Sequence, residues 1–86
     1  MNIYVGNQLY ERVALGGRQT ITITQPDGRI NRVVVTEEGA YMDYSTCGNQ
    51  DCIHQGAVTR QNMESRPLQN WIICLPNQVT VELAAQ

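Results

Sequence analysis

The chain has 86 residues, the length of one small domain, and 42% of them are hydrophobic, which is enough for a thin apolar core. Its formal net charge is −2 and its six basic residues are arginines scattered along the sequence, so we do not expect the basic face of a nucleic-acid-binding protein. No stretch is apolar over the length of a membrane span, and residues 1–15 lack a signal-peptide pattern, so a membrane tether or export signal would lie outside this sequence. We expect a single domain over residues 1–86.

The first quarter of the chain predicts short antiparallel strands. In residues 2–15, apolar side chains alternate with polar ones on both sides of a Gly-Asn pair at 6–7, which predicts a β-hairpin. Residues 19–25, QTITITQ, alternate more strictly, with Ile21 and Ile23 on one face and threonines on the other. This segment is the clearest strand signal in the sequence.

Two further strands are predicted before the first cysteine. The sequence PDG at 26–28 is typical of a tight turn, and the apolar run that follows predicts a strand over residues 30–37. A Glu-Glu-Gly turn at 37–39 then leads into a fifth strand over residues 40–46. Turn signals that recur about every eight to twelve residues are typical of a small sandwich or barrel.

The β pattern is interrupted by CGNQDCIHQG, residues 47–56. Asn49 suits the N-cap of a helix and Gly56 suits the position just past its end, so we expect about one and a half helical turns over residues 50–55. A polar connection without further elements is predicted over residues 57–70.

The last two elements are again strands. Residues 71–76, WIICLP, form a nearly continuous apolar run, and residues 79–83, VTVEL, alternate with Val79, Val81 and Leu83 on one face. The expected fold is therefore all-β: a small antiparallel β-sandwich or barrel-like domain with one short helix.

Three cysteines and the single histidine suggest a metal site as one possibility. Cys47, Cys52, Cys74 and His54 together make a Cys₃His set, which can hold tetrahedral zinc. Cys52 and His54, however, would point roughly 200° apart around a helix, which makes a shared ion difficult. Our primary expectation is that the protein holds no metal and no cofactor.

The same cysteines also suggest a disulfide or a redox site. A Cys47–Cys52 bridge would close a short loop, whereas a Cys52–Cys74 bridge would tie the helix to the strand and stabilise the fold by roughly 3 kcal/mol in the chain-entropy model. A thiol near a helix N-terminus can also be reactive. In a reducing compartment all three would be thiols, with Cys74 packed in the core.

No recognisable nucleophile motif, phosphate loop or carboxylate pair occurs, so we expect a protein that is not an enzyme. The expected binding surface is the short helix with the polar segment 59–70. The candidate binding residues are His54, Gln55, Arg60 and Arg66.

The carboxy-terminal half resembles a known family. Its cysteine motif C-x₄-C-x-x-Q-G, from Cys47 to Gly56, and the later segment IICLPN, residues 72–77, resemble the second (insert) domain of some bacterial NusG transcription factors and their stand-alone relatives. The specific part covers roughly residues 44–83, and residues 1–43 fit more loosely. The resemblance implies an all-β domain with one short helix, and an exported or membrane-anchored stand-alone protein of uncharacterised role.

The resemblance also shows departures that bear on function. Gly48 stands where the family often has proline, Ala57 where it often has an aromatic residue, and the lysines common in the family are absent. The expected function is a non-catalytic module that binds a protein partner. The alternatives are a cysteine-based redox or metal-binding accessory protein, and binding to nucleic acid or a transcription complex by analogy with NusG, which the acidic balance disfavours.

Overall fold

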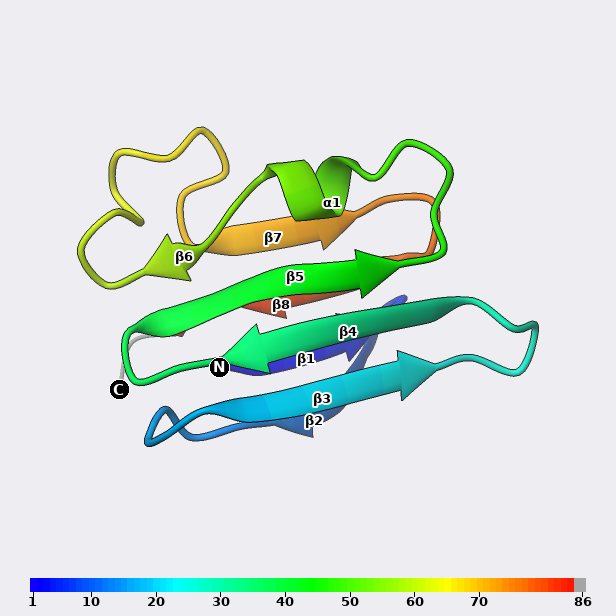
Figure 1. The fold of residues 1–86 in the computed structure, drawn as a ribbon, viewed down its shortest axis with the longest axis horizontal. Coiled ribbons are helices and arrows are strands. Elements are labelled where there is room, and N and C mark those ends of the chain that lie inside the picture. Colours follow the sequence, from blue (N-terminus) through cyan, green and yellow to red (C-terminus); the bar gives the residue numbers. More distant parts are fainter. Residues whose placement is uncertain (85–86) are drawn as a thin grey trace.

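A computed structural model describes residues 1–84 as two four-stranded antiparallel sheets packed face to face, with one short helix along one edge of the sandwich (Figure 1). The elements are β1 (Asn2–Val5), β2 (Gln8–Arg12), β3 (Gln19–Thr24), β4 (Ile30–Val35), β5 (Gly39–Ser45), α1 (Asp51–His54), β6 (Val58–Thr59), β7 (Trp71–Cys74) and β8 (Val79–Glu82). The predicted fold class, a small antiparallel sandwich with one short helix, is confirmed.

The two sheets have the strand orders β2-β1-β8-β7 and β3-β4-β5-β6. The first strand therefore lies between its hairpin partner β2 and the last strand β8, with Ile3 opposite Val81. The predicted hairpins β1–β2, β3–β4 and β4–β5 are all present. Pairing of β1 with β8 joins the two ends of the sequence in one sheet, and only the tertiary structure shows it.

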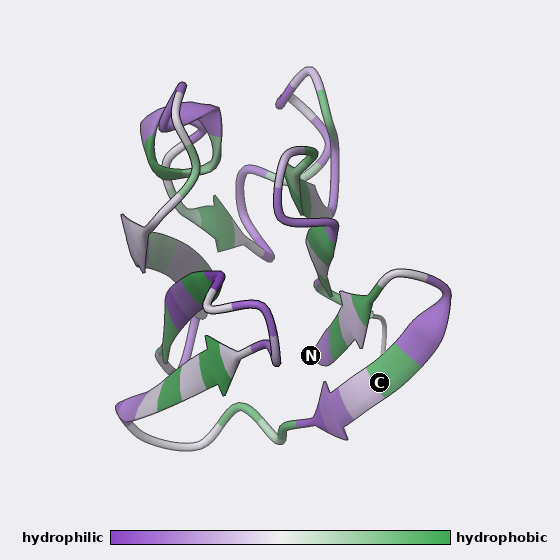
Figure 2. Ribbon diagram, turned by 90° about the vertical axis from the view of Figure 1, so that its right-hand side faces the viewer, coloured by the Kyte–Doolittle hydropathy of each residue, from purple (hydrophilic) through white to green (hydrophobic). Residues whose placement is uncertain are grey.

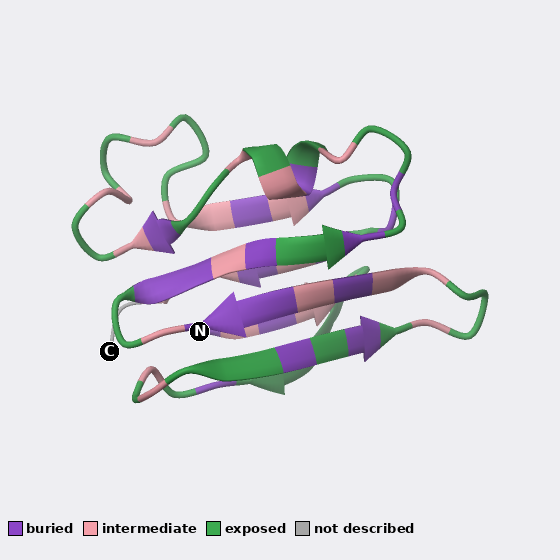
Figure 3. Ribbon diagram, in the orientation of Figure 1, coloured by how far each residue is buried: buried purple, intermediate pink, exposed green. Residues whose placement is uncertain are grey.

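Alternation of apolar and polar residues places the core between the sheets. Ile21 and Ile23 of β3 are buried, and so are Val79, Val81 and Leu83 at the end of the chain, as predicted. The alternating bands along the strands are visible in Figure 2, and Figure 3 shows buried positions alternating with exposed ones along β3. Each fully buried aliphatic side chain contributes about 1.5–3 kcal/mol to folding.

The segment 57–70 contains an element that the sequence pattern did not reveal. Strand β6 pairs with the start of β5, with Gly39 opposite Thr59. A Cβ atom on Gly39 would lie 1.8 Å from the Val58 carbonyl oxygen, so only glycine allows this close approach. A strand of two residues is too short to produce a detectable period, which is why it was missed.

The predicted helix is present but begins differently. The N-cap is Gln50, with φ 58°, and not Asn49 as expected. The Asn49 side chain instead accepts a hydrogen bond from the Asp51 N–H at 3.0 Å, which is a turn that precedes the helix. At the other end Gly56 adopts φ 73°, as expected of a residue just past a helix.

Candidate functional site: the three-cysteine cluster and the edge of β7

The three cysteines meet in space although they come from three different segments. Cys47 precedes α1, Cys52 lies within α1 and Cys74 ends β7. All three side chains are buried, their Sγ atoms lie within 4.8 Å of one another, and the Cys47 and Cys52 sulfurs are 3.7 Å apart. All three are free thiols in this structure. The helix therefore packs on the edge strand through sulfur, and which thiols pair on oxidation stays a prediction.

His54 does not join this cluster. Within residues 1–84, the group of metal-ligating side chains that converges here consists of the three cysteines alone. His54 is exposed on α1, because two positions along a helix turn the side chain away from that of Cys52. The Cys₃His set considered from the sequence is therefore not assembled.

A buried network of polar side chains lies beside the thiols. The Ser45 hydroxyl is 3.7 Å from the Cys74 sulfur and accepts hydrogen bonds from the Cys47 N–H at 3.1 Å and the Asn31 amide at 3.1 Å. Asn77 in turn donates to the Asn31 Oδ1 at 2.9 Å. Asn31 and Asn77 are 0% and 2% exposed. Sequence reasoning missed this network; the available signal was the polar Asn31 next to the apolar run Val33–Val35 of β4.

The surroundings shift the pKa values of two of the thiols in opposite directions. Burial raises the pKa of the Cys52 thiol to about 12, and its neighbour Cys74 acts in the same direction. Burial also opposes ionisation of Cys74, but hydrogen bonds from the Asn31 side chain, the Asn77 backbone N–H and Ser45 outweigh it and lower the pKa of that thiol. Of these two thiols, Cys74 is therefore the one that ionises first.

The raised pKa of Cys52 predicts a specific alkaline weakening of the fold. The Cys52 thiol ionises near 9.0 in the unfolded chain and near 12 in the folded one, so the folded state binds more protons between these values and the free energy of unfolding falls as the pH rises. The difference in free energy of unfolding between wild type and Cys52→Ala, measured by urea unfolding, should therefore decrease as the pH rises across this range. The gap to Val58→Ala, a buried substitution without a titratable group, should stay constant; parallel profiles for all three proteins would contradict the prediction.

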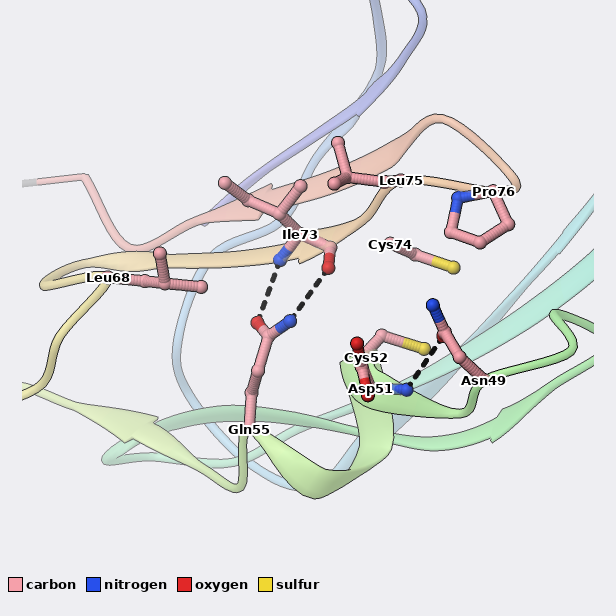
Figure 4. A pocket seen from close by; sticks show the side chains of 9 residues that line it. All are labelled: Asn49, Asp51, Cys52, Gln55, Leu68, Ile73, Cys74, Leu75 and Pro76. Carbon is pink, nitrogen blue, oxygen red and sulfur yellow. Dashed lines mark hydrogen bonds between the residues drawn. The ribbon is translucent and has the colours of Figure 1, made fainter.

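Gln55 closes the outer edge of β7 with its side chain. Its amide Nε2 donates to the Ile73 carbonyl at 2.8 Å, and its Oε1 accepts the Ile73 N–H at 2.9 Å (Figure 4). One side chain thus takes the place of a neighbouring strand. Exposed strand edges invite pairing with other chains, and this contact removes that possibility at the middle of β7.

The other candidate binding residues have different roles. Arg66 donates to the backbone carbonyls of Trp71 at 2.9 Å and of Gln69 at 2.6 Å, so it holds the segment 60–70 against β7. Arg60 is exposed and makes one long bond, 3.4 Å, to the Glu37 carbonyl. The hydrogen-bonding groups of Gln55 and Arg66 are therefore engaged within the chain, whereas the side chains of His54 and Arg60 are exposed.

A recess of about 170 Å³ lies between α1 and β7, directly over two of the sulfurs. The residues that line it are Asn49, Asp51, Cys52, Gln55, Leu68, Ile73, Cys74, Leu75 and Pro76 (Figure 4). Leucines at its rim are open to solvent: Leu75 is 78% exposed and Leu68 is 37% exposed. The recess therefore combines an apolar rim with a floor of thiols.

Comparison with known proteins places this architecture in a family. The profile described as NusG domain II matches residues 1–86. The crystal structure of a DUF1312 family protein from Ruminococcus gnavus ATCC 29149 is 34% identical, with a TM-score of 0.70 over 94% of this chain and 91% of that chain. That of a DUF1312 family protein from Enterococcus faecalis V583 is 18% identical, with a TM-score of 0.77 over 96% and 95% of the two chains. No curated protein matches the sequence.

Proposed function

The chain belongs to the NusG domain II (DUF1312) family, and on this premise we propose that it is a non-catalytic module that binds a protein partner through the end of the sandwich formed by α1, β7 and the β7–β8 turn. The observation that carries the proposal is Leu75, the most exposed of the large hydrophobic side chains among residues 1–84. Large apolar side chains that remain in water beside an apolar recess are typical of interaction surfaces.

The turn that presents Leu75 is held by hydrogen bonds from the β3–β4 turn of the other sheet. Arg29 donates to the Pro76 carbonyl at 2.9 Å, and Gln25 donates to the Asn77 carbonyl at 2.8 Å. The Leu75 carbonyl itself accepts the Gln78 N–H at 3.1 Å. A side chain presented on a rigid turn loses little conformational entropy on binding, so this arrangement favours association.

Site-specific photo-crosslinking tests the proposal. A photoreactive residue at position 75 should give a discrete adduct in an extract of the source organism, whereas the same residue at the exposed position Gln61 should not. Excess wild-type protein should suppress the adduct, and excess Leu75→Asp should not, because a charged side chain cannot enter an apolar socket. Equal adducts at both positions, or equal competition by a folded Leu75→Asp, would refute the proposal.

Nucleic acid is a weaker candidate partner. Two of the six arginines, Arg29 and Arg32, form ion pairs with Asp27 and Asp43, which reduces their attraction for phosphate. Binding through the remaining arginines would weaken steeply with added salt.

We also propose that the protein acts outside the cytoplasm or at a membrane. Within residues 1–84 no helix is both long and apolar enough to cross a membrane. Support for the proposal comes from the resemblance to stand-alone members of the family. Protease accessibility of the protein in intact cells would test it.

A further inference from the structure

The spacing of the three sulfurs is close to that around a bound thiophilic ion. Metal–thiolate bonds of about 2.3 Å place three sulfurs in a plane around one ion about 4.0 Å apart. Here Cys47 and Cys52 are 3.7 Å apart, and Cys74 lies within 4.8 Å of both. Small side-chain rotations, without movement of β7 or α1, therefore bring all three to bonding distance of one central ion.

The side chains that could bind an ion here are three cysteines, whose sulfur atoms are soft ligands. Within the described part of the chain no histidine or carboxylate joins the cluster. Two side-chain oxygens are hydrogen-bonded to the sulfurs: that of Ser45, 3.7 Å from the Cys74 sulfur, and that of Asn49, 3.8 Å from the Cys47 sulfur. Structural zinc sites use four nitrogen or sulfur ligands, whereas three thiolates without a fourth ligand favour a soft monovalent ion such as Cu(I).

The surroundings supply what such a site needs besides its ligands. The recess over Cys52 and Cys74 provides an entry path, and the Asp51 carboxylate beside it attracts cations. The Gln50 amide is 3.8 Å from the Cys47 sulfur. Donors around the sulfurs offset the negative charge of thiolates and hold their orientation.

We propose that Cys47, Cys52 and Cys74 form a binding site for a single Cu(I) ion held by three sulfur ligands. Binding replaces thiol protons, which pass to solvent, and transfers no electrons, since Cu(I) keeps its oxidation state. The metal makes a thiol with a raised pKa ionise. The proposal is independent of the partner proposed for Leu75.

Titration of the full chain with Cu(I) tests the site. Reduced protein under anaerobic conditions should withdraw a single equivalent of Cu(I) from its bicinchoninate complex, and X-ray absorption should show sulfur neighbours at about 2.3 Å. Saturation should raise the melting temperature by roughly ten degrees or more. Zn(II) should bind more weakly.

Variants separate this site from its rivals. Cys47→Ala and Cys74→Ser should each lose at least about a hundredfold in Cu(I) affinity, whereas His54→Ala should bind as wild type. Circular dichroism tests whether each metal-free variant is folded. If a cysteine variant does not fold, X-ray absorption of the wild type still decides whether sulfur atoms bind the ion. The proposal is overturned if folded, reduced wild-type protein takes up no Cu(I), if His54→Ala loses the ion, or if a folded cysteine variant binds it undiminished. If the reduced protein instead reacts with glutathione disulfide to form an internal disulfide and takes up no Cu(I), the cluster is a redox-active dithiol and not a metal site.

Discussion

Replacing Asn77 with alanine is expected to lower the free energy of unfolding by about 3 kcal/mol. The Asn77 amide donates to Asn31 at 2.9 Å, to Thr46 at 3.2 Å and to Ser45 at 3.4 Å, and it links the β7–β8 turn of one sheet to β4 and β5 of the other. Its removal leaves the Asn31 Oδ1, which is fully buried, without its donor. For a domain of this length, whose total stability is about 4–13 kcal/mol, this is a large fraction.

Chemical denaturation of the single and double variants would measure the network itself. Asn31→Ala and Asn77→Ala should be non-additive by about 1 kcal/mol or more, because each removes the partner of the other. Asn7→Ala, on an exposed turn, is the matched control and should change stability by no more than about 0.5 kcal/mol. Additive losses, or an Asn77 variant as stable as the control, would show that the network contributes little.

Replacing Gln55 with alanine is expected to lower the free energy of unfolding by about 2–3 kcal/mol. The substitution removes both hydrogen bonds to Ile73 and leaves a backbone N–H and C=O unpaired at the edge of β7. It also frees that edge, so the variant should associate at high concentration through strand pairing. Gln61→Ala, at an exposed position of the segment 57–70, is the control and should match the wild type in stability and association.

An isosteric change makes the test of Gln55 specific. Glutamate at position 55 keeps an acceptor for the Ile73 N–H, but its second carboxylate oxygen replaces the amide donor and faces the Ile73 carbonyl. Because two acceptors then face each other, Gln55→Glu should be less stable than wild type at neutral pH. Protonation of the glutamic acid restores a donor, so the gap to wild type should shrink as the pH falls through the pKa of that carboxyl. A gap that does not change with pH, or a Gln55→Ala variant as stable as wild type, would mean that the contact is not important.

The sandwich could be predicted from the sequence because its signals are local. Strict alternation in β3 and β8, the Gly-Asn turn of the first hairpin and the glycine after α1 each express a preference of neighbouring residues, and each was confirmed. The family could be recognised for a related reason, because the cysteine motif and the segment IICLPN are each a short contiguous stretch of sequence.

The candidate site could be predicted only in part. The cysteines were identified from the sequence, but their mutual distances, the exclusion of His54 and the role of Gln55 as a substitute strand depend on how α1 lies against β7. Asn31 and Asn77 are far apart in sequence, and nothing local indicates that they are hydrogen-bonded to each other.

By itself, then, the sequence determined the strands other than β6, the turns that join them and the family to which the chain belongs, because these properties depend on the chemistry of adjacent residues. Only the tertiary structure decided that β1 pairs with β8, that Gln55 closes the edge of β7 and that three sulfurs meet, two of them lining the recess. These contacts join residues distant along the chain, and their geometry is set by the packing of two sheets, to which every strand contributes.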